Sequence, residues 1–304
     1  MENLTVKALG ISILFYGVIS FTGFKSSAYY FDVRKLPQVK IGGAVRLNYS
    51  YLDYEQHSKD TYGELDFELF RLKINASIKK LELVAQYRWY SDFDFPEYAY
   101  FRYQSSELSE VQLGLTRVPF GILPYSSHGY WESILYHLGL EDDNDIGVKY
   151  IYRDEQWDIR AGFFNNSELD AATDARFSFD IVTNEQLQQF NQEKNQLNIR
   201  MERNLKWIKV GGSAQYGQLY NTSSGKSGHH YAAALHLLAD IDSWNVQLEY
   251  GVYDHQPKNS DEQFNDRVQF GAYGTSFGVA SEAEFLLLNF SKDIAINHPW
   301  IDEL

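Results

Sequence analysis

A strict two-residue alternation constrains this chain more than any other feature, and it is clearest in residues 39–51. The odd-numbered positions, such as Val45 and Leu47, are apolar or aromatic apart from a glycine, while the even-numbered ones, such as Arg46 and Asn48, are polar or small. This is the period of a β-strand with one apolar and one polar face. The run exceeds the ~9–11 residues that a tilted strand needs to cross a bilayer.

The same alternation recurs along the chain. In residues 65–78 it changes phase by one position, which predicts a β-bulge. A loop is expected around residues 92–96, and the longest connection spans residues 165–195. The alternating segments are 39–51, 65–78, 81–89, 98–103, 111–117, 146–152, 157–164, 197–202, 208–216, 230–237, 244–252, 267–272 and, less regularly, 283–290.

Short turns and long polar loops alternate between these segments, as they do in an up-and-down barrel with two unequal rims. Tryptophans such as Trp89, Trp157 and Trp244 stand at segment ends, where a membrane-interface girdle would lie. A secreted β-sandwich also alternates, but it does not require long strands, aromatic ends and unequal loops together. We therefore predict an all-β, antiparallel, up-and-down transmembrane β-barrel.

Composition narrows the possible functions. The formal net charge is -14 and the pI is about 5.0, which argues against nucleic acid as a partner. The absence of cysteine excludes a thiol nucleophile, a cysteine metal centre and a disulfide. Low mean hydropathy does not argue against membrane strands, because half of their residues face water.

The first 28 residues read as a secretory signal peptide. A lysine precedes an apolar run over residues 8–23, and small residues follow at the cleavage positions ending in Ala28. A membrane-anchoring helix is the alternative, but the run is shorter than the ~20 residues that a spanning helix needs. We expect the barrel to occupy residues 29–304.

Three short stretches resemble a known family. Residues 113–121 (LGLTRVPFG) are similar to the V-G-Q-F-K-x-P-F-G strand end of the phosphate-selective porin O and P family. Residues 145–148 (DIGV) resemble its R-D-I-G-V motif, with Asn144 in place of the arginine, and residues 70–73 (FRLK) resemble its F-R-x-R strand. The resemblance implies a Gram-negative outer-membrane porin of about sixteen strands, commonly a homotrimer, with one loop folded into the lumen.

The end of the chain departs from that pattern. Residues 297–304 look like the start of another strand and not like an aromatic closing strand. Only about twelve or thirteen strands are therefore expected, and we interpret the sequence as C-terminally incomplete. As it stands, such a sheet would have an open edge, which lipid does not tolerate.

The polar set of residues predicts a lumen biased toward positive charge. Arginine and lysine rings suit anion passage, and arginine binds phosphate or carboxylate bidentately. The alternative is that these cations pair with inward acids such as Glu82, Asp158, Glu202 and Glu249, and only stiffen the wall. The candidate pore-lining residues are Arg46, Arg71, Lys73, Arg88, Arg102, Arg117, Lys149 and Arg160.

Residues 122–145 show no strand period and form the candidate constriction loop. The alternative is an extracellular loop that packs on its own rim. The side chains expected to meet solutes are Tyr125, His128, Tyr130, Trp131, Glu132 and His137.

Other chemistry is weakly indicated. Residues 141–145 (EDDND) suggest Ca²⁺ ligands but lack the spacing of a calcium loop, so a solvated acidic tip is the preferred interpretation. His229, His230 and His236 lie on different strand faces with no acid joining them, so no metal site and no cofactor are predicted.

The expected function is passive diffusion of small anionic or neutral solutes across the Gram-negative outer membrane, with lipid as the surrounding partner and no enzymatic activity. One alternative is a barrel enzyme of lipase or protease type, for which His128 and His137 are the candidate bases. The other alternative is a non-conducting surface β protein.

Overall fold

The structure, a computed structural model, describes residues 37–127 and 132–294, which belong to one unit, Pro37–Leu304. The predicted signal peptide and the segment 297–304 lie outside the described residues. The elements are β1 (Gln38–Ser50), α2 (Gln56–Thr61), β2 (Glu64–Ile78), β3 (Leu81–Trp89), β4 (Asp94–Gln104), β5 (Ser109–Arg117), α3 (Ile134–His137), β6 (Asn144–Arg153), β7 (Trp157–Ser167), β8 (Asp180–Ile181), β9 (Asn191–Asn204), β10 (Ile208–Asn221), β11 (Ser227–Ile241), β12 (Trp244–Gln256), η2 (Glu262–Phe264), β13 (Arg267–Ala272), β14 (Thr275–Ala280) and β15 (Glu282–Lys292).

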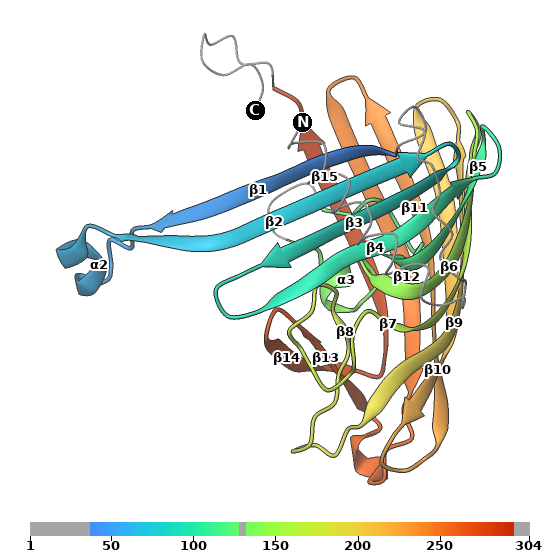
Figure 1. The fold of residues 1–304 in the computed structure, drawn as a ribbon. Helices are drawn as coiled ribbons and strands as arrows, with labels where there is room; N and C mark the ends of the chain where they lie inside the picture. Colours follow the sequence, from blue (N-terminus) through green and yellow to red (C-terminus); the bar gives the residue numbers. More distant parts are fainter. Residues whose placement is uncertain (1–36, 128–131, 295–304) are drawn as a thin grey trace, which may run out of the picture. The chain divides into compact units, whose positions relative to one another are not determined.

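Twelve of the described strands form one antiparallel sheet in the order β1-β2-β3-β4-β5-β6-β7-β9-β10-β11-β12-β15 (Figure 1). Each strand of this sheet pairs with the next one along the chain, so the predicted all-β, up-and-down topology is confirmed. Within the residues described, β1 and β15 are the two edges and do not pair with each other, so the sheet is open.

The phase change in the second segment is a β-bulge, as predicted. Arg46 pairs with Leu69 and Leu47 pairs with Phe67, so that Glu68 is the extra residue. The insertion returns the apolar side chains to one face of the sheet on both sides of the bulge. The loop expected at residues 92–96 is shorter than predicted, because β4 already begins at Asp94.

The segment 267–272 is not a strand of the large sheet, contrary to the prediction. It forms β13, which pairs with β14 and β8 in a separate three-stranded sheet. The less regular segment, now β15, takes the predicted place and pairs with β12. Val268, Phe270 and Ala272 of β13 are buried in a core, and a period of two does not distinguish a face that packs on protein from one that faces lipid.

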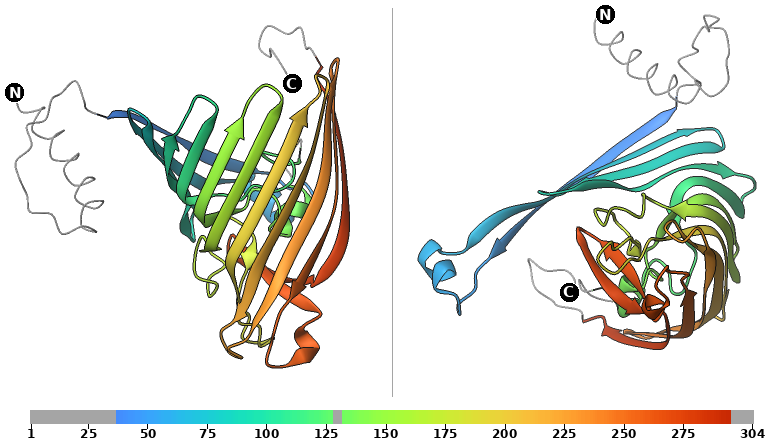
Figure 2. Two further views of the ribbon diagram at one scale, coloured as in Figure 1. Left: turned by 90° about the vertical axis from the view of Figure 1, so that its right-hand side faces the viewer. Right: turned by 90° about the horizontal axis from the view of Figure 1, so that it is seen from below.

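The long connections fold onto the concave side of the large sheet, where β13 and β14 also lie (Figure 2). Leu135 and Leu140 of the connection after β5 pack with Ala232 and Ala234 of β11. Tyr136, Phe179 and Phe270 belong to a second cluster. The connections and the small sheet thus fill part of the inner space and bury apolar side chains there.

The large sheet keeps its two faces along each strand. In β9 the outward residues Leu197 and Ile199 are 59% and 47% exposed, whereas the inward Asn198 and Arg200 are 4% and 1% exposed. Leu235 of β11 is 70% exposed. No helix in the described part of the chain has the length and hydropathy to cross a bilayer.

Candidate functional site

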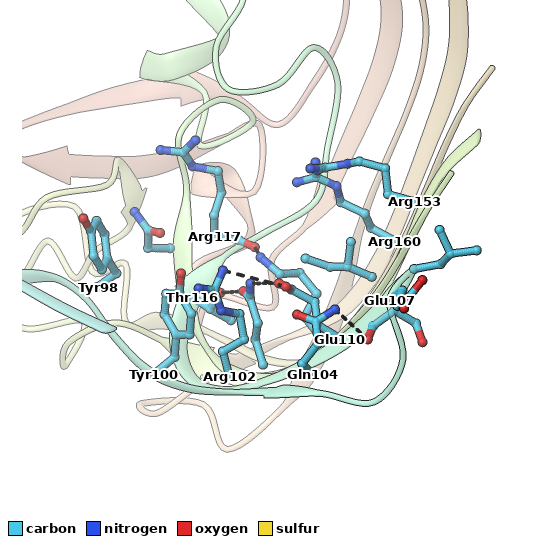
Figure 3. A pocket seen from close by; sticks show the side chains of 16 residues that line it. Tyr98, Tyr100, Arg102, Gln104, Glu107, Glu110, Thr116, Arg117, Arg153 and Arg160 are labelled. Carbon is cyan, nitrogen blue, oxygen red and sulfur yellow. Dashed lines mark hydrogen bonds and ion pairs between the residues drawn. The ribbon is translucent and has the colours of Figure 1, made fainter. Parts of the chain in front are cut away.

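Four of the predicted pore-lining cations meet on the inner face of β4–β7. Arg102, Arg117, Lys149 and Arg160 line a cavity of about 510 Å³, to which the structure adds Arg153 (Figure 3). Because strands of an up-and-down sheet lie side by side, inward residues on neighbouring strands converge. We call this cavity the basic pocket.

Cations outnumber acids among the residues that line the basic pocket. Its lining includes these five cations but only two acids, Glu107 and Glu110. Tyr98 and Tyr100 add hydroxyl groups on β4. A cavity with several cationic donors and few carboxylates suits an anionic solute.

Part of this charge is neutralised by ion pairs. Arg102 contacts Glu82 and lies 3.8 Å from Glu110. Arg117 pairs with Asp142. Burial raises the pKa of the Asp142 carboxyl to about 7, although the charge of Arg117 acts to lower it. The Lys149 ammonium donates to the carbonyl oxygen of Arg117 at 2.6 Å.

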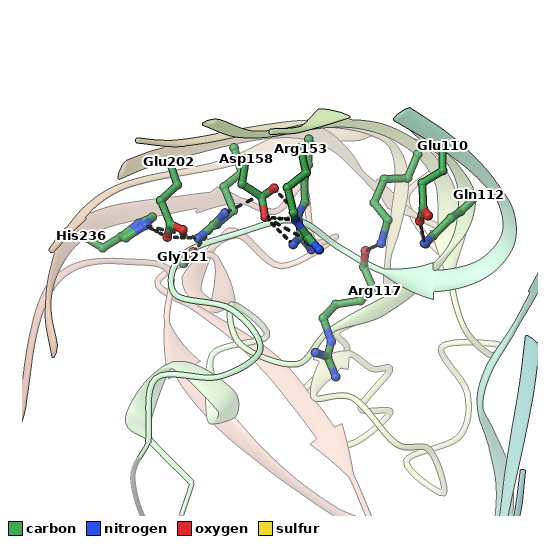
Figure 4. A network of polar contacts seen from close by, with 11 residues as sticks. Glu110, Gln112, Arg117, Gly121, Arg153, Asp158, Glu202 and His236 are labelled. Atoms are coloured by element: carbon green, nitrogen blue, oxygen red, sulfur yellow. Dashed lines mark hydrogen bonds and ion pairs between the residues drawn. The ribbon is translucent and has the colours of Figure 1, made fainter. Parts of the chain in front are cut away.

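Arginines and acids next to the basic pocket form a continuous polar network (Figure 4). Asp158 lies 2.8 Å from Arg160 and 3.1 Å from Arg153. Arg200 lies 4.0 Å from Asp158 and 2.6 Å from Glu202. These contacts, like those of Arg102 and Arg117, match the alternative interpretation, in which inward cations pair with inward acids. Of the five cations of the basic pocket, Lys149 is the one without an ion pair among the described residues.

The other predicted cations lie outside the basic pocket. Arg46 of β1 pairs with Glu68 across the bulge. Arg88 of β3 lies 2.5 Å from Glu97, with its guanidinium 4.7 Å from the centre of the Phe177 ring. Arg71 and Lys73 of β2 show no ion pair among the residues the structure describes. The sequence groups all eight cations by face, but only the fold separates them by position along the strands.

The candidate constriction loop begins by folding onto the inner wall. The Gly121 amide donates to the Ser213 hydroxyl at 2.9 Å, and the Ile122 amide donates to Glu249 at 3.3 Å. The side-chain amide of Asn289 on β15 donates to the carbonyl oxygen of Ser126. These contacts place the segment against the wall; that it narrows a pore stays a prediction.

The three predicted constriction residues that the structure describes differ in their surroundings. Tyr125 is 47% exposed and Glu132 is also exposed. His137, a candidate base in the enzyme alternative, packs 4.9 Å from the ring of Phe179 and also contacts Tyr136 and Phe277. The remaining three, His128, Tyr130 and Trp131, lie outside the described residues.

The acidic tip predicted at residues 141–145 is wrong, because this segment is buried. Glu141, Asp143 and Asp145 are 5%, 7% and 3% exposed. The segment leads directly into β6 beneath the small sheet, and Ser126 and Ser133 donate hydrogen bonds to Glu141. Burial of these carboxylates depends on segments distant in sequence, which local composition does not reveal.

The prediction that no acid joins the histidines is also wrong. His236 lies 3.0 Å from Glu202, and His230 lies 3.6 Å from Glu193. The ring of His230 stacks on that of His255, with 5.7 Å between the ring centres. Arg153 was missed as well, because the sequence places it in the turn after residues 146–152, whereas β6 extends to Arg153.

Known proteins resemble this chain in structure but not detectably in sequence. No protein-family model and no curated protein sequence matches this chain. The outer membrane channel DcaP of Acinetobacter baumannii is 11% identical with a TM-score of 0.49, over 86% of this chain and 75% of that one. The anion-selective porin from Comamonas acidovorans is 12% identical with a TM-score of 0.36, over 77% and 82%. OmpT, an outer membrane protein of Vibrio cholerae, is 10% identical with a TM-score of 0.33, over 84% and 96%. Such identities do not define a family.

Proposed function

We propose that this protein is a porin of the Gram-negative outer membrane, providing a water-filled passage for small hydrophilic solutes with a preference for anions. The observation that carries the proposal is the two-faced large sheet, which exposes apolar side chains outward and gathers cations inward. Passive diffusion involves no catalytic step, so the proposal assigns no enzymatic activity.

The outer face supports placement in lipid. Large apolar side chains stand exposed on neighbouring strands. Leu235, Tyr250 and Leu286 are in register on β11, β12 and β15 and are 70%, 46% and 68% exposed. A contiguous apolar surface of this kind exceeds what soluble proteins expose to water. Outward apolar residues that alternate with inward polar ones are the pattern of a membrane-spanning strand.

The basic pocket supports the preference for anions. Arg153 and Arg160 share Asp158, so their combined positive charge is only partly compensated. Guanidinium groups also present paired donors to phosphate or carboxylate. The similarity of residues 113–121 to a phosphate-selective porin motif makes phosphate the first anion to test.

The test is the reversal potential of the full-length protein in planar bilayers under a KCl gradient. We expect conductance to rise in discrete steps as channels insert, and the sign of the reversal potential to show that chloride passes more easily than potassium. Absence of conductance, or a reversal potential of the cation-selective sign, overturns the corresponding part of the proposal.

Matched variants locate the selectivity. R153Q and R160Q each remove one pocket charge, and a unit charge at about 4 Å in water is worth about 1 kcal/mol, or roughly fivefold in relative permeability. R203Q is the control, because Arg203 lies on the outer face of β9 with its guanidinium 5.2 Å from the centre of the Trp157 ring. Equal changes in relative permeability for the three variants would show that the basic pocket does not set the selectivity.

We also propose that the protein acts as a homotrimer. An apolar groove on the outer face of β9–β12 contains the small residues Gly212, Ala214 and Ala233. Small residues allow two chains to approach closely within a membrane. Cross-linking in detergent should give a trimer, and a monomer under the same conditions would contradict this assembly.

A further inference from the structure

Three buried aspartates converge where the large sheet meets the small one. Asp143 precedes β6, Asp145 lies near its start, and Asp180 belongs to β8. One carboxylate oxygen from each lies within 4.8 Å of the others. The three side chains are 7%, 3% and 2% exposed. We call this group the aspartate cluster.

Two glutamates add to the negative charge. The Glu193 carboxyl on β9 lies close enough to Asp180 to interact with it electrostatically, and Glu168 follows β7 and is 5% exposed. Among the arginines and lysines that the structure describes, Arg176 alone forms an ion pair with these five acids, at 2.9 Å from Asp180. Five ionised carboxylates against one guanidinium would leave a strong excess of negative charge away from water, which is costly unless a cation or bound protons compensate it.

Unpartnered oxygen atoms within the group indicate a missing ligand. One carboxylate oxygen on each of Asp143, Asp145 and Glu168 is buried without a hydrogen-bond partner. The other Glu168 oxygen accepts from the Phe177 and Ser178 amides, which fixes the orientation of that side chain. Burial and the neighbouring Asp145 and Asp180 charges raise the pKa of Asp143 well above its ordinary range.

We propose that the aspartate cluster binds a divalent cation of the Ca²⁺ class. Hard carboxylate oxygens are the ligands that Ca²⁺ prefers, at 2.3–2.6 Å, so oxygens on opposite sides of one ion lie about 5 Å apart. The spacing of up to 4.8 Å in the cluster fits this span. Mg²⁺, with ligands at about 2.1 Å, requires a tighter arrangement and retains more water.

The ion would join the wall to the segments inside it. Asp145 belongs to the wall, whereas Asp180 belongs to the small sheet, whose Ile181 packs in the inner core with Tyr136. The Val118 amide donates to the carbonyl oxygen of Asp143 at 2.8 Å, so the cluster also borders the turn where the chain enters the lumen. This role goes beyond conduction and is independent of ion selectivity.

Calcium binding to the full-length protein in detergent tests the proposal. After removal of metal with EDTA, equilibrium dialysis against ⁴⁵Ca²⁺ should give one bound ion per chain, with Mg²⁺ a weak competitor. Added Ca²⁺ should also raise the thermal midpoint. No bound Ca²⁺ at millimolar concentration overturns the proposal, whatever the conductance shows.

Two variants place the ion. D143N/D145N keeps the side-chain shapes but removes two carboxylates, and it should weaken binding by more than about 100-fold. E185Q is the control, because Glu185 is an exposed residue in the connection between β8 and β9. Binding by D143N/D145N equal to that of wild type would assign the ion elsewhere and overturn the site. If D143N/D145N fails to fold, E168Q provides the same comparison.

Discussion

The Arg200 guanidinium donates a hydrogen bond at 2.6 Å to the carbonyl oxygen of Gly121, joining the middle of β9 to the corner where the chain leaves β5. Arg200 is 1% exposed and also contacts Glu202 at 2.6 Å. One buried cation thus holds the inward segment to the wall and belongs to the polar network beside the basic pocket.

Replacement of Arg200 by methionine should destabilise the protein. It leaves the Gly121 carbonyl without its buried donor and leaves Glu202 with His236 alone. The loss of one member of a buried ion pair costs about 3–5 kcal/mol. Urea unfolding in detergent, followed by tryptophan fluorescence, measures the change. R203M, on the outer face, should cost no more than about 1 kcal/mol. Similar costs for both variants would show that the Gly121 contact adds little.

The G121A variant tests the corner itself. Gly121 has φ +56°, and an added Cβ would lie 2.3 Å from a Glu249 carboxylate oxygen. The left-handed conformation alone costs a non-glycine residue about 1–2 kcal/mol. Gly225 has φ +68° with open space around it, so G225A should show the conformational cost alone. G121A should therefore unfold at lower urea than G225A, and equal midpoints would mean that Glu249 moves away freely.

Replacing residues 125–137 by a glycine–serine linker should raise single-channel conductance. This removes Leu135, which packs on the inner wall near Ala232 and Ala234, and so opens space on the concave side. Conductance of the variant and of wild type would be compared in the same bilayers. Unchanged conductance would place the constriction in another segment.

An arginine in place of Leu235 should impair membrane insertion. Leu235 lies in the central part of β11 and is 70% exposed on the outer face. A charged residue at the bilayer midplane costs a barrel about 2–4 kcal/mol. Folding into liposomes at increasing urea measures this, with S224R in the β10–β11 connection as the control. A cost below about 0.5 kcal/mol, typical of water-exposed surface, would contradict lipid contact at this position.

Much of the large sheet could be predicted from sequence, because its strands are long and have two unlike faces. The limits of β3 match the predicted segment, and the phase change within residues 65–78 predicted a bulge, which the structure places at Glu68. The assignment failed for β13, whose apolar residues bury against protein. Alternation reports that a face avoids water, and it does not report what covers that face.

The basic pocket was partly predictable for the same reason. Arg102, Arg117, Lys149 and Arg160 all fall on the polar face, and adjacent antiparallel strands bring such residues together. Their ion pairs were not predictable in detail, since Asp142, the partner of Arg117, belongs to a connection.

The sequence alone determined which side of each long strand avoids water, because side-chain direction along a strand has a fixed period of two. Only the tertiary structure decided where the connections go. It placed Asp180 beside Asp143 and Asp145, and it turned an apparently solvated acidic stretch into a buried one. Packing brings together and buries residues that are distant in sequence, and local periodicity carries no information about such packing.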